Sequence, residues 1–272
     1  MRTRPSSLVI AGATLLILSG SSSLFAIYNG AADGTGHPAV GFVLGTKGPD
    51  PCDYNQQAIG CSGVLIAPNY FLSTGDCVSS VEDSIASGFI DDGWVILDAQ
   101  PLVAGDPEPT LDCTKFVHID TYDLNPGYTV SGDVGVMTLA TAQSITPATL
   151  PPFNRLKPKP KKNLPDITGV SFGELPGVGG GFDIFTLLRR FAHAAFGTIG
   201  PDLHVAIFDQ LPGPNDPCVG FLTRGGPIFA TGTDQVVSLA RYPATTCDNS
   251  ASFQRLDVNS VRPFLSNYVT LP

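Results

Sequence analysis

The sequence has few charged residues, few histidines and no apolar segment long enough to cross a membrane. Charged residues make up 14% of the 272 residues, and histidine occurs four times. The run of apolar and small residues at Leu8–Leu18 has only eleven members, whereas a spanning helix needs about 20. No two cysteines are spaced as C-x-x-C and no histidine stands at ligand spacing, so we predict no metal site and no cofactor.

The first 26 residues have the pattern of a secretory signal peptide. Arg2 and Arg4 precede the run Leu8–Leu18, and mostly small residues follow over Ser19–Ala26. An uncleaved N-terminal anchor is the alternative, which the shortness of the run disfavours. Removal of residues 1–26 leaves 13 basic and 24 acidic residues, a net charge of −11. We therefore predict a secreted protein that binds neither nucleic acid nor, after signal removal, membranes.

Six cysteines in an exported chain predict three disulfide bonds. Six cysteines allow 15 pairings, and the spacing alone does not choose among them. A zinc site is the alternative, and the absence of ligand spacing disfavours it. The cysteines are Cys52, Cys61, Cys77, Cys113, Cys218 and Cys247.

Short apolar or β-branched segments between turn residues predict an all-β protein. Glycine (30) and proline (24) are abundant, and both residues break helices and populate tight turns. The best helical pattern is Leu256–Val269, although Pro263 delays its start. Nine segments are predicted strands: Val40–Leu44, Gly63–Ile66, Tyr70–Ser73, Trp94–Leu97, Val134–Leu139, Ile167–Phe172, Leu203–Phe208, Pro227–Ala230 and Val236–Leu239.

A proline-rich segment at residues 144–154 is interpreted as a linker between two halves, 27–143 and 155–272. The next segment, Arg155–Lys162, alternates lysine with proline and is predicted to be extended and exposed. A solvated loop is the favoured interpretation; a docking site for an acidic partner and a protease-sensitive loop are the alternatives. Gly177–Gly181 lacks the Lys-Ser/Thr of a phosphate-binding loop, which disfavours nucleotide binding.

Two segments resemble the signatures of the trypsin/chymotrypsin-like serine peptidases. Cys61–Ile66 (CSGVLI) with Phe71–Cys77 (FLSTGDC) resembles C-S-G-x-L-I…T-A-x-H-C, and Leu222–Pro227 (LTRGGP) resembles G-D-S-G-G-P. The opening, Ile27–Gly41, and the ending, Phe253–Leu265, resemble the secreted bacterial members of that family. The resemblance runs from about Ile27 to the C-terminus. It implies one domain, 27–272, of two packed six-stranded antiparallel β-barrels with a short C-terminal helix.

The resemblance also implies a disulfide pairing and a set of site positions. It pairs Cys61 with Cys77 and Cys218 with Cys247, which leaves Cys52 and Cys113 as a third pair. Ser131–Val136 resembles the segment that supplies the triad aspartate, so Asp133 takes that place. Asp76 then stands at the position of the family's histidine, and Arg224 at that of its nucleophilic serine.

These departures predict that the chain is not a working peptidase. In the family, serine attacks the scissile carbonyl, histidine takes the proton and aspartate orients the histidine. A guanidinium stays protonated and cannot attack, and the carboxylate of Asp76 is a weak base. Leu222 replaces an oxyanion-hole glycine, and Thr223 replaces the aspartate that receives a new N-terminus. Loss of nucleophile and base together costs on the order of a millionfold in rate.

None of the four histidines, His37, His118, His193 and His204, is placed to replace the missing base. We therefore predict a secreted, monomeric, proteolytically inactive homologue that recognises a protein or peptide ligand through its cleft or loops. A serine endopeptidase with weak or relocated activity is the alternative, and a purely structural or decoy role is another. At the site we expect an ion-pair cluster in which Arg224 bridges Asp76 and Asp133; the alternative is that Arg224 points to solvent.

Overall fold

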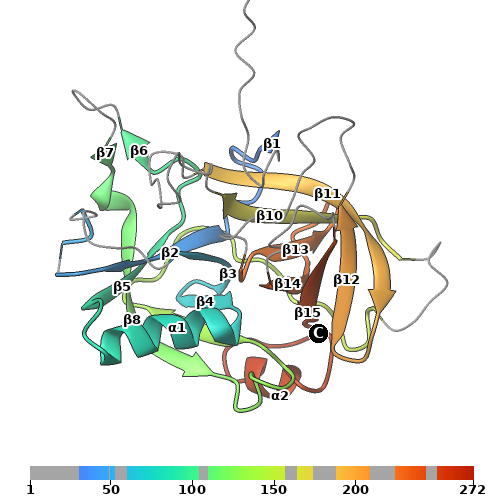
Figure 1. Cartoon of the computed structure of the whole chain (residues 1–272). Coiled ribbons are helices and arrows are strands. Elements are labelled where there is room, and N and C mark those ends of the chain that lie inside the picture. Colours follow the sequence, from blue (N-terminus) through green and yellow to red (C-terminus); the bar gives the residue numbers. More distant parts are fainter. Residues whose placement is uncertain are drawn as a thin grey trace, which may run out of the picture.

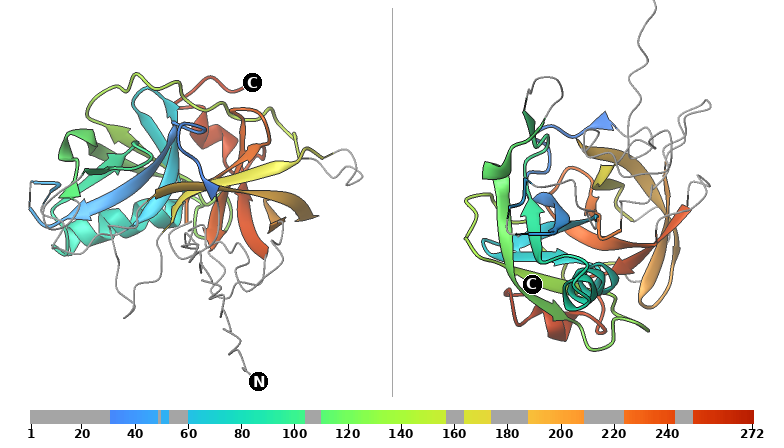
Figure 2. Two further views of the ribbon diagram at one scale, coloured as in Figure 1. Left: turned by 90° about the horizontal axis from the view of Figure 1, so that it is seen from above. Right: turned by 60° about the vertical axis from the view of Figure 1, so that its left-hand side comes forward.

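The chain forms two closed six-stranded antiparallel β-barrels that lie side by side, as the three views in Figures 1 and 2 show. This all-β architecture confirms the predicted fold class. The computed structural model describes residues 31–48, 50–52, 60–103, 110–156, 164–173, 188–208, 224–242 and 250–272.

The first barrel has the strand order β2-β3-β4-β9-β8-β5 and occupies the left of Figure 1. All neighbouring strands are antiparallel, and the pairing of β2 with β5 closes the barrel. Its strands are β2 (Val40–Thr46), β3 (Cys61–Ala67), β4 (Tyr70–Ser73), β5 (Asp92–Ile96), β8 (Phe116–Leu124) and β9 (Gly135–Leu139).

The second barrel has the order β11-β10-β13-β14-β15-β12 and is closed by the pairing of β11 with β12. A short strand at the beginning of the described chain, β1 (Ala31–Ala32), pairs antiparallel with β11. The barrel strands are β10 (Ile167–Gly173), β11 (Leu188–Ile199), β12 (Leu203–Phe208), β13 (Pro227–Ala230), β14 (Val236–Tyr242) and β15 (Ser250–Arg255).

Helices are few and lie outside the barrels. The longer helix, α1 (Gly75–Ala86), follows β4 directly, and the C-terminal helix, α2 (Arg262–Leu265), has one turn. The predicted short C-terminal helix is confirmed, and it begins beside Pro263 as expected, because proline is tolerated in the first turn of a helix. A small hairpin, β6 (Leu102–Val103) and β7 (Thr110–Leu111), and a 3-10 turn, Cys113–Lys115, complete the elements. No helix among the described residues is both long and apolar enough to span a bilayer.

The strands of the second barrel face two different cores. On β13, Phe229 packs into the large core that fills the first barrel and the junction, whereas Ile228 and Ala230 pack into the core of the second barrel. Side chains alternate between the faces of a strand, so neighbouring residues reach opposite sides. On β14, Leu239 and Ala240 divide in the same way. The first barrel is thus packed directly against the outside of the second.

Buried polar contacts also join the two barrels. Arg189, on β11, donates from Nε to the Asp33 carboxylate at 2.8 Å and from its two Nη atoms to three backbone carbonyls. The side chains of Arg189 and Asp33 are almost completely buried. His37 completes the network, because its backbone N–H and its Nδ1 lie 2.9 and 2.6 Å from the same carboxylate. The three carbonyls that accept hydrogen bonds from Arg189 belong to Gly34, Val40 and Leu97.

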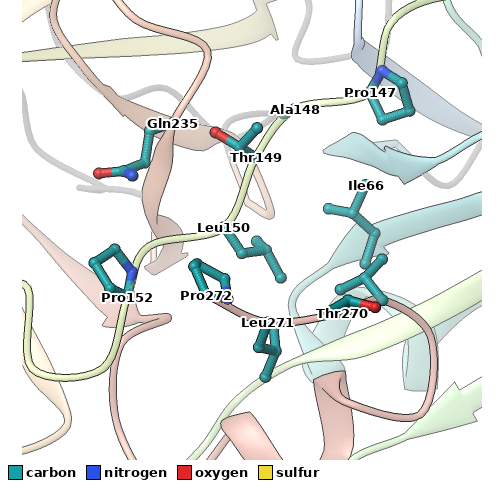
Figure 3. A pocket seen from close by; sticks show the side chains of 11 residues that line it. Ile66, Pro147, Ala148, Thr149, Leu150, Pro152, Gln235, Thr270, Leu271 and Pro272 are labelled. Atoms are coloured by element: carbon teal, nitrogen blue, oxygen red, sulfur yellow. The ribbon is translucent and has the colours of Figure 1, made fainter.

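The predicted linker is bonded to both barrels. Ala148 N–H donates to the carbonyl of Leu65 in β3, while Thr149 N–H donates to Asp234 and its carbonyl accepts from Val236 in β14. The linker and the C-terminal residues also line a cavity of ≈ 600 Å³ (Figure 3). None of its eleven lining side chains is ionisable. The cavity is therefore lined mostly by apolar side chains and by no titratable side chain.

Several predicted segments lie outside the described residues. They are the signal peptide 1–26, the opening 27–30, the glycine-rich segment Gly177–Gly181 and all of the basic segment after Leu156. The proposed domain limits therefore remain predictions.

Candidate functional site

The structure brings Asp76, Asp133 and Arg224 together at the junction of the two barrels. Asp76 is the second residue of α1, and Asp133 lies just before β9, so both come from the first barrel. Arg224 lies just before β13 and comes from the second. The three residues are far apart in the sequence, and only the packing of one barrel on the other joins them.

Asp76 is held at the N-terminus of a helix. Thr74 is the N-cap residue, and its hydroxyl accepts from the backbone N–H of Cys77 at 3.4 Å. A carboxylate in the first turn is favoured because the free N–H groups there carry partial positive charge. The side chain of Asp76 is 45% exposed and forms an ion pair with Nη1 of Arg224. Asp76 is thus a partly exposed carboxylate that is stabilised both by the helix N-terminus and by Arg224.

Asp133 is the deep carboxylate of the site, with 1% of its side chain exposed. Its Oδ1 accepts from the backbone N–H of Asp76 at 3.0 Å, and its Oδ2 accepts from Nε of Arg241 at 3.1 Å. Its own backbone N–H donates to Oε1 of Gln254 at 3.0 Å. Burial raises the pKa of Asp133 above its usual value, and the bonds from Asp76 N–H and Arg241 oppose that rise.

Arg224 has a tightly fixed backbone. Its carbonyl accepts from the N–H of Ser62 in β3 at 2.8 Å. The next residue, Gly225, has φ +78°, and a Cβ there would collide with the carbonyl of Ser62 and the hydroxyl of Ser73. Only glycine suits this combination of positive φ and close approach. The guanidinium therefore projects from a rigid point in the seam between the barrels.

The expected ion-pair cluster is present, but with a different division of partners. Arg224 pairs with Asp76, and Asp133 takes Arg241 as its cation instead of sharing Arg224. Sequence reasoning missed Arg241 because the predicted strand ended at Leu239. In the structure β14 continues to Tyr242, and the alternation along that strand was the available signal.

The four histidines lie away from this cluster. His37 bonds Asp33, and His118 lies between Asp92 and Asp120 at 3.1 and 3.2 Å. His193 bonds the hydroxyl of Thr168 on the second barrel at 3.1 Å. His204 is buried in the second barrel, where its Nε2 lies 2.7 Å from Oγ of Ser238. No imidazole is therefore paired with Asp76, Asp133 or Arg224.

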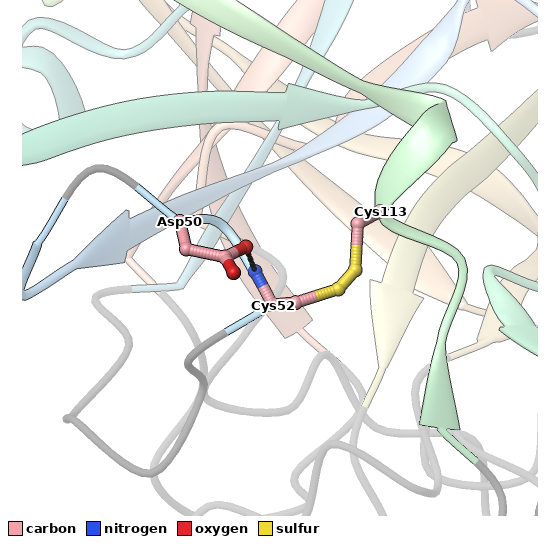
Figure 4. A group of neighbouring side chains, drawn as sticks. All are labelled: Asp50, Cys52 and Cys113. Atoms are coloured by element: carbon pink, nitrogen blue, oxygen red, sulfur yellow. Dashed lines mark hydrogen bonds between the residues drawn. A yellow bond between two sulfur atoms is a disulfide. The ribbon is translucent and has the colours of Figure 1, made fainter.

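Two disulfide bonds lie within the described residues. Cys61 at the start of β3 is joined to Cys77 in α1, with Cα atoms 6.2 Å apart, so that bond ties the Asp76 helix to the barrel. Cys52 is joined to Cys113, with Cα atoms 5.5 Å apart (Figure 4). Asp50 lies beside this second bond and accepts from the backbone N–H of Cys52 at 2.8 Å. Asp50, Cys52 and Cys113 lie close enough together to resemble a set of metal ligands. The two sulfur atoms are joined in a disulfide and are not thiolates, so these three residues do not form a metal site.

The remaining predicted site residues fall outside the part of the chain that the structure describes. They are the oxyanion-loop residues Leu222 and Thr223 and the cysteines Cys218 and Cys247. Their roles and the third disulfide stay predictions.

Comparisons with known proteins identify the fold. The sequence matches no protein-family model and no curated protein. The structure is similar to HL collagenase, with 16% identity, a TM-score of 0.58 and coverage of 88% of this chain and 97% of that one. It is similar to the scabies mite inactivated protease paralogue S-D1, with 14% identity, a TM-score of 0.60 and coverage of 89% and 99%.

A second scabies mite inactivated protease paralogue, S-I1, is similar at 14% identity, with a TM-score of 0.56 and coverage of 87% of this chain and 97% of that one. Structural similarity at such low sequence identity shows the fold alone. The two closed barrels, the C-terminal helix and these similarities lead to one conclusion: the chain has the fold of the trypsin-like serine proteases.

Proposed function

We propose that this chain is a secreted protein of trypsin-like fold that binds a protein or peptide without cleaving it. We propose further that Asp76, Asp133 and Arg224 occupy the positions of the family's histidine, aspartate and serine. The observation that carries the proposal is the ion pair between Arg224 and Asp76 at the junction of the barrels. A guanidinium and a carboxylate that neutralise each other supply neither a nucleophile nor a strong base.

The hydroxyl groups beside this ion pair are already committed to structural bonds. Oγ of Ser73 is buried and donates to the carbonyl of Ser62 at 2.7 Å. Oγ of Ser62 accepts from the backbone N–H of Phe172 at 3.0 Å. Neither hydroxyl has an imidazole beside it that would take its proton. These contacts support an inactive site.

The alternative, a serine endopeptidase with relocated activity, needs a hydroxyl paired with a base. His204 and Ser238 form such a pair, with 2.7 Å between Nε2 and Oγ. Both residues are sealed inside the second barrel, and the imidazole is packed against Phe196 and Phe253. A peptide cannot reach this pair without unfolding the barrel. In the second such pair, Thr168 with His193, the threonine is buried and its hydroxyl is also bonded to Thr231. The burial of both hydroxyl-bearing residues argues against the alternative.

Two further observations support the proposal. The scabies mite paralogues S-D1 and S-I1 are inactivated proteases, so this fold persists in proteins that have lost proteolysis. The two disulfides support export, because such bonds form and persist in oxidising compartments. We propose a monomer, which light scattering on the purified protein would test.

The test of function is a turnover assay on the mature, oxidised protein. It is incubated with a broad fluorogenic peptide library and with a fluorophosphonate probe, beside an active trypsin-like protease as the positive control. We expect no cleavage and no labelling. The double variant Asp76→His/Arg224→Ser is run in parallel to show whether the native framework still supports chemistry. Turnover by the natural protein that survives repurification would refute the proposal and establish a relocated active site.

A further inference from the structure

We propose that Arg224 is the recognition residue for a ligand carboxylate. In this inference Asp76 is an internal substitute that pairs with Arg224 when no ligand is bound, and the carboxylate of a bound peptide replaces it. The inference rests on the proposed binding function and names the chemistry of its ligand. The carboxylate belongs to an acidic side chain or to a peptide C-terminus, which share this chemistry.

The first argument is the rigid placement of Arg224. Its carbonyl is bonded to Ser62 N–H across the seam, and Gly225 is pressed against Ser62 and Ser73. A side chain whose backbone is already ordered loses less conformational freedom when it binds. The backbone from which the guanidinium extends is therefore already ordered at the junction.

The second argument is the unused hydrogen-bonding capacity of the guanidinium. A guanidinium carries five N–H donors and prefers two parallel bonds to a carboxylate. Within the described residues, the Arg224 side chain makes one bond, from Nη1 to Oδ2 of Asp76. The side chain is 24% exposed, so solvent reaches it. A ligand carboxylate that bonds at two points would use donors that Asp76 leaves unused.

The third argument is that release of Asp76 costs little. Asp76 is nearly half exposed and stands in the first turn of a 12-residue helix, which favours a carboxylate there without any arginine. Displacing Arg224 instead, by a ligand ammonium group, would leave the less exposed member of the pair without its counter-ion. This asymmetry selects carboxylates over cations.

The deep carboxylate does not compete for Arg224. Asp133 is neutralised by Arg241 and bonded to Asp76 N–H, and both bonds persist when the Asp76 side chain turns away. The net charge of the whole chain is −9, so its long-range field repels polyanions. The site therefore suits a peptide with a single carboxylate at the contact point, and it disfavours a phosphate-rich polymer.

The test follows the Nε–H resonance of Arg224 by NMR in the oxidised protein. Two probes separate the sources of the carboxylate: N-acetylglycine offers a main-chain carboxylate, and N-acetylglutamate α-amide offers a side-chain carboxylate. N-acetylglutamine α-amide is the uncharged control. We expect a saturable shift with at least one carboxylate probe and none with the control.

Variants make the test decisive. Asp76→Asn removes the internal competitor, and we expect carboxylate binding to tighten by about two- to fivefold, the range set by an exposed ion pair. In Arg224→Gln, and in Arg224→Lys, which keeps the charge but loses the paired donors, saturable perturbation of the neighbouring amides should disappear or weaken at least threefold. Lys47→Gln, in the exposed pair with Asp91, is the matched control and should bind as the natural protein does.

Three results would overturn the inference: no saturable shift in either the natural protein or Asp76→Asn, binding that persists in Arg224→Gln, or saturation by N-acetyl-lysine amide alone. The turnover assay has an independent readout. A protein that is proteolytically silent and does not bind carboxylates would therefore retain the proposed inactivity and lose only this inference.

Discussion

Replacing Arg189 by methionine should destabilise the protein more than any surface change of the same type. The substitution keeps an unbranched apolar stem and removes the guanidinium. It leaves the buried Asp33 carboxylate without its arginine and removes the donors of three backbone carbonyls. Removing one member of a buried ion pair costs about 3–5 kcal/mol, because the other charge stays buried.

The matched comparison is the exposed pair of Lys47 and Asp91, whose side chains are 43% and 47% exposed. An ion pair at that exposure contributes about 1 kcal/mol or less, so Lys47→Gln should scarcely change stability. Trp94 is the single tryptophan and donates from its indole N–H to Thr46 in the first barrel. Its fluorescence during urea unfolding, extrapolated to water, gives both free energies of unfolding.

The pH dependence of the same variant adds a second check. Burial alone raises the pKa of Asp33, but bonds from His37 and Arg189 outweigh burial, and the net pKa lies below its usual value of 3.8. A lowered carboxylate pKa stabilises the fold above the unfolded pKa, and this stabilisation is lost as the pH falls through the folded pKa. Arg189→Met should reduce that acid-sensitive contribution. A loss of stability below about 1 kcal/mol at neutral pH would refute the assigned role of the buried pair.

Three further predictions concern other buried groups. Burial lowers the pKa of His204 to about 4 from 6.5, so stability should fall by about 3 kcal/mol as the pH drops from 6.5 to 4, and titrated urea melts of His204→Phe should lack most of this slope. Gly225→Ala should lower stability by about 2 kcal/mol or more, because it combines positive φ with a collision, and calorimetry would measure it; an unchanged melting temperature would contradict the seam geometry. Arg241→Met should cost about 3 kcal/mol, and adding Asp133→Asn should recover part of the loss in a double-mutant cycle; additive losses would contradict the pairing.

Among the strands of the two barrels, the sequence predicted those whose residues are mostly apolar, and it missed those that carry more polar side chains. All nine predicted segments coincide with strands, with ends shifted by a few residues. The missed barrel strands are β8, β11 and β15, and the two-residue strands β1, β6 and β7 were missed as well. On β11 the adjacent buried arginines Arg189 and Arg190 obscure the alternation, and Arg189 is neutralised by Asp33, a residue 156 positions earlier in the chain. The alternation of residues along one strand cannot reveal partners that lie far away in the sequence.

Helix α1 was missed although it carries a helical signal. Val78, Val81 and Ile85 recur at spacings of three and four, and Thr74 is a suitable N-cap. The resemblance implied a role for Asp76 and no helix in the segment that holds it. At the site, the meeting of Asp76, Asp133 and Arg224 was expected from the resemblance, whereas the allocation of Arg241 to Asp133 depends on the twist and length of β14, which only the folded barrel defines.

The bonded linker has a mechanical consequence for any ligand at the junction. A free tether would let the barrels swing apart as a hinge, but Ala148 and Thr149 are each bonded to a different barrel. Separating the barrels would break these backbone bonds, expose the shared apolar core and remove the carbonyls of Val40 and Leu97 from Arg189. The two barrels should therefore keep one relative orientation when a ligand binds. Shape complementarity to this fixed surface, and not closure of the barrels around the ligand, should determine what binds.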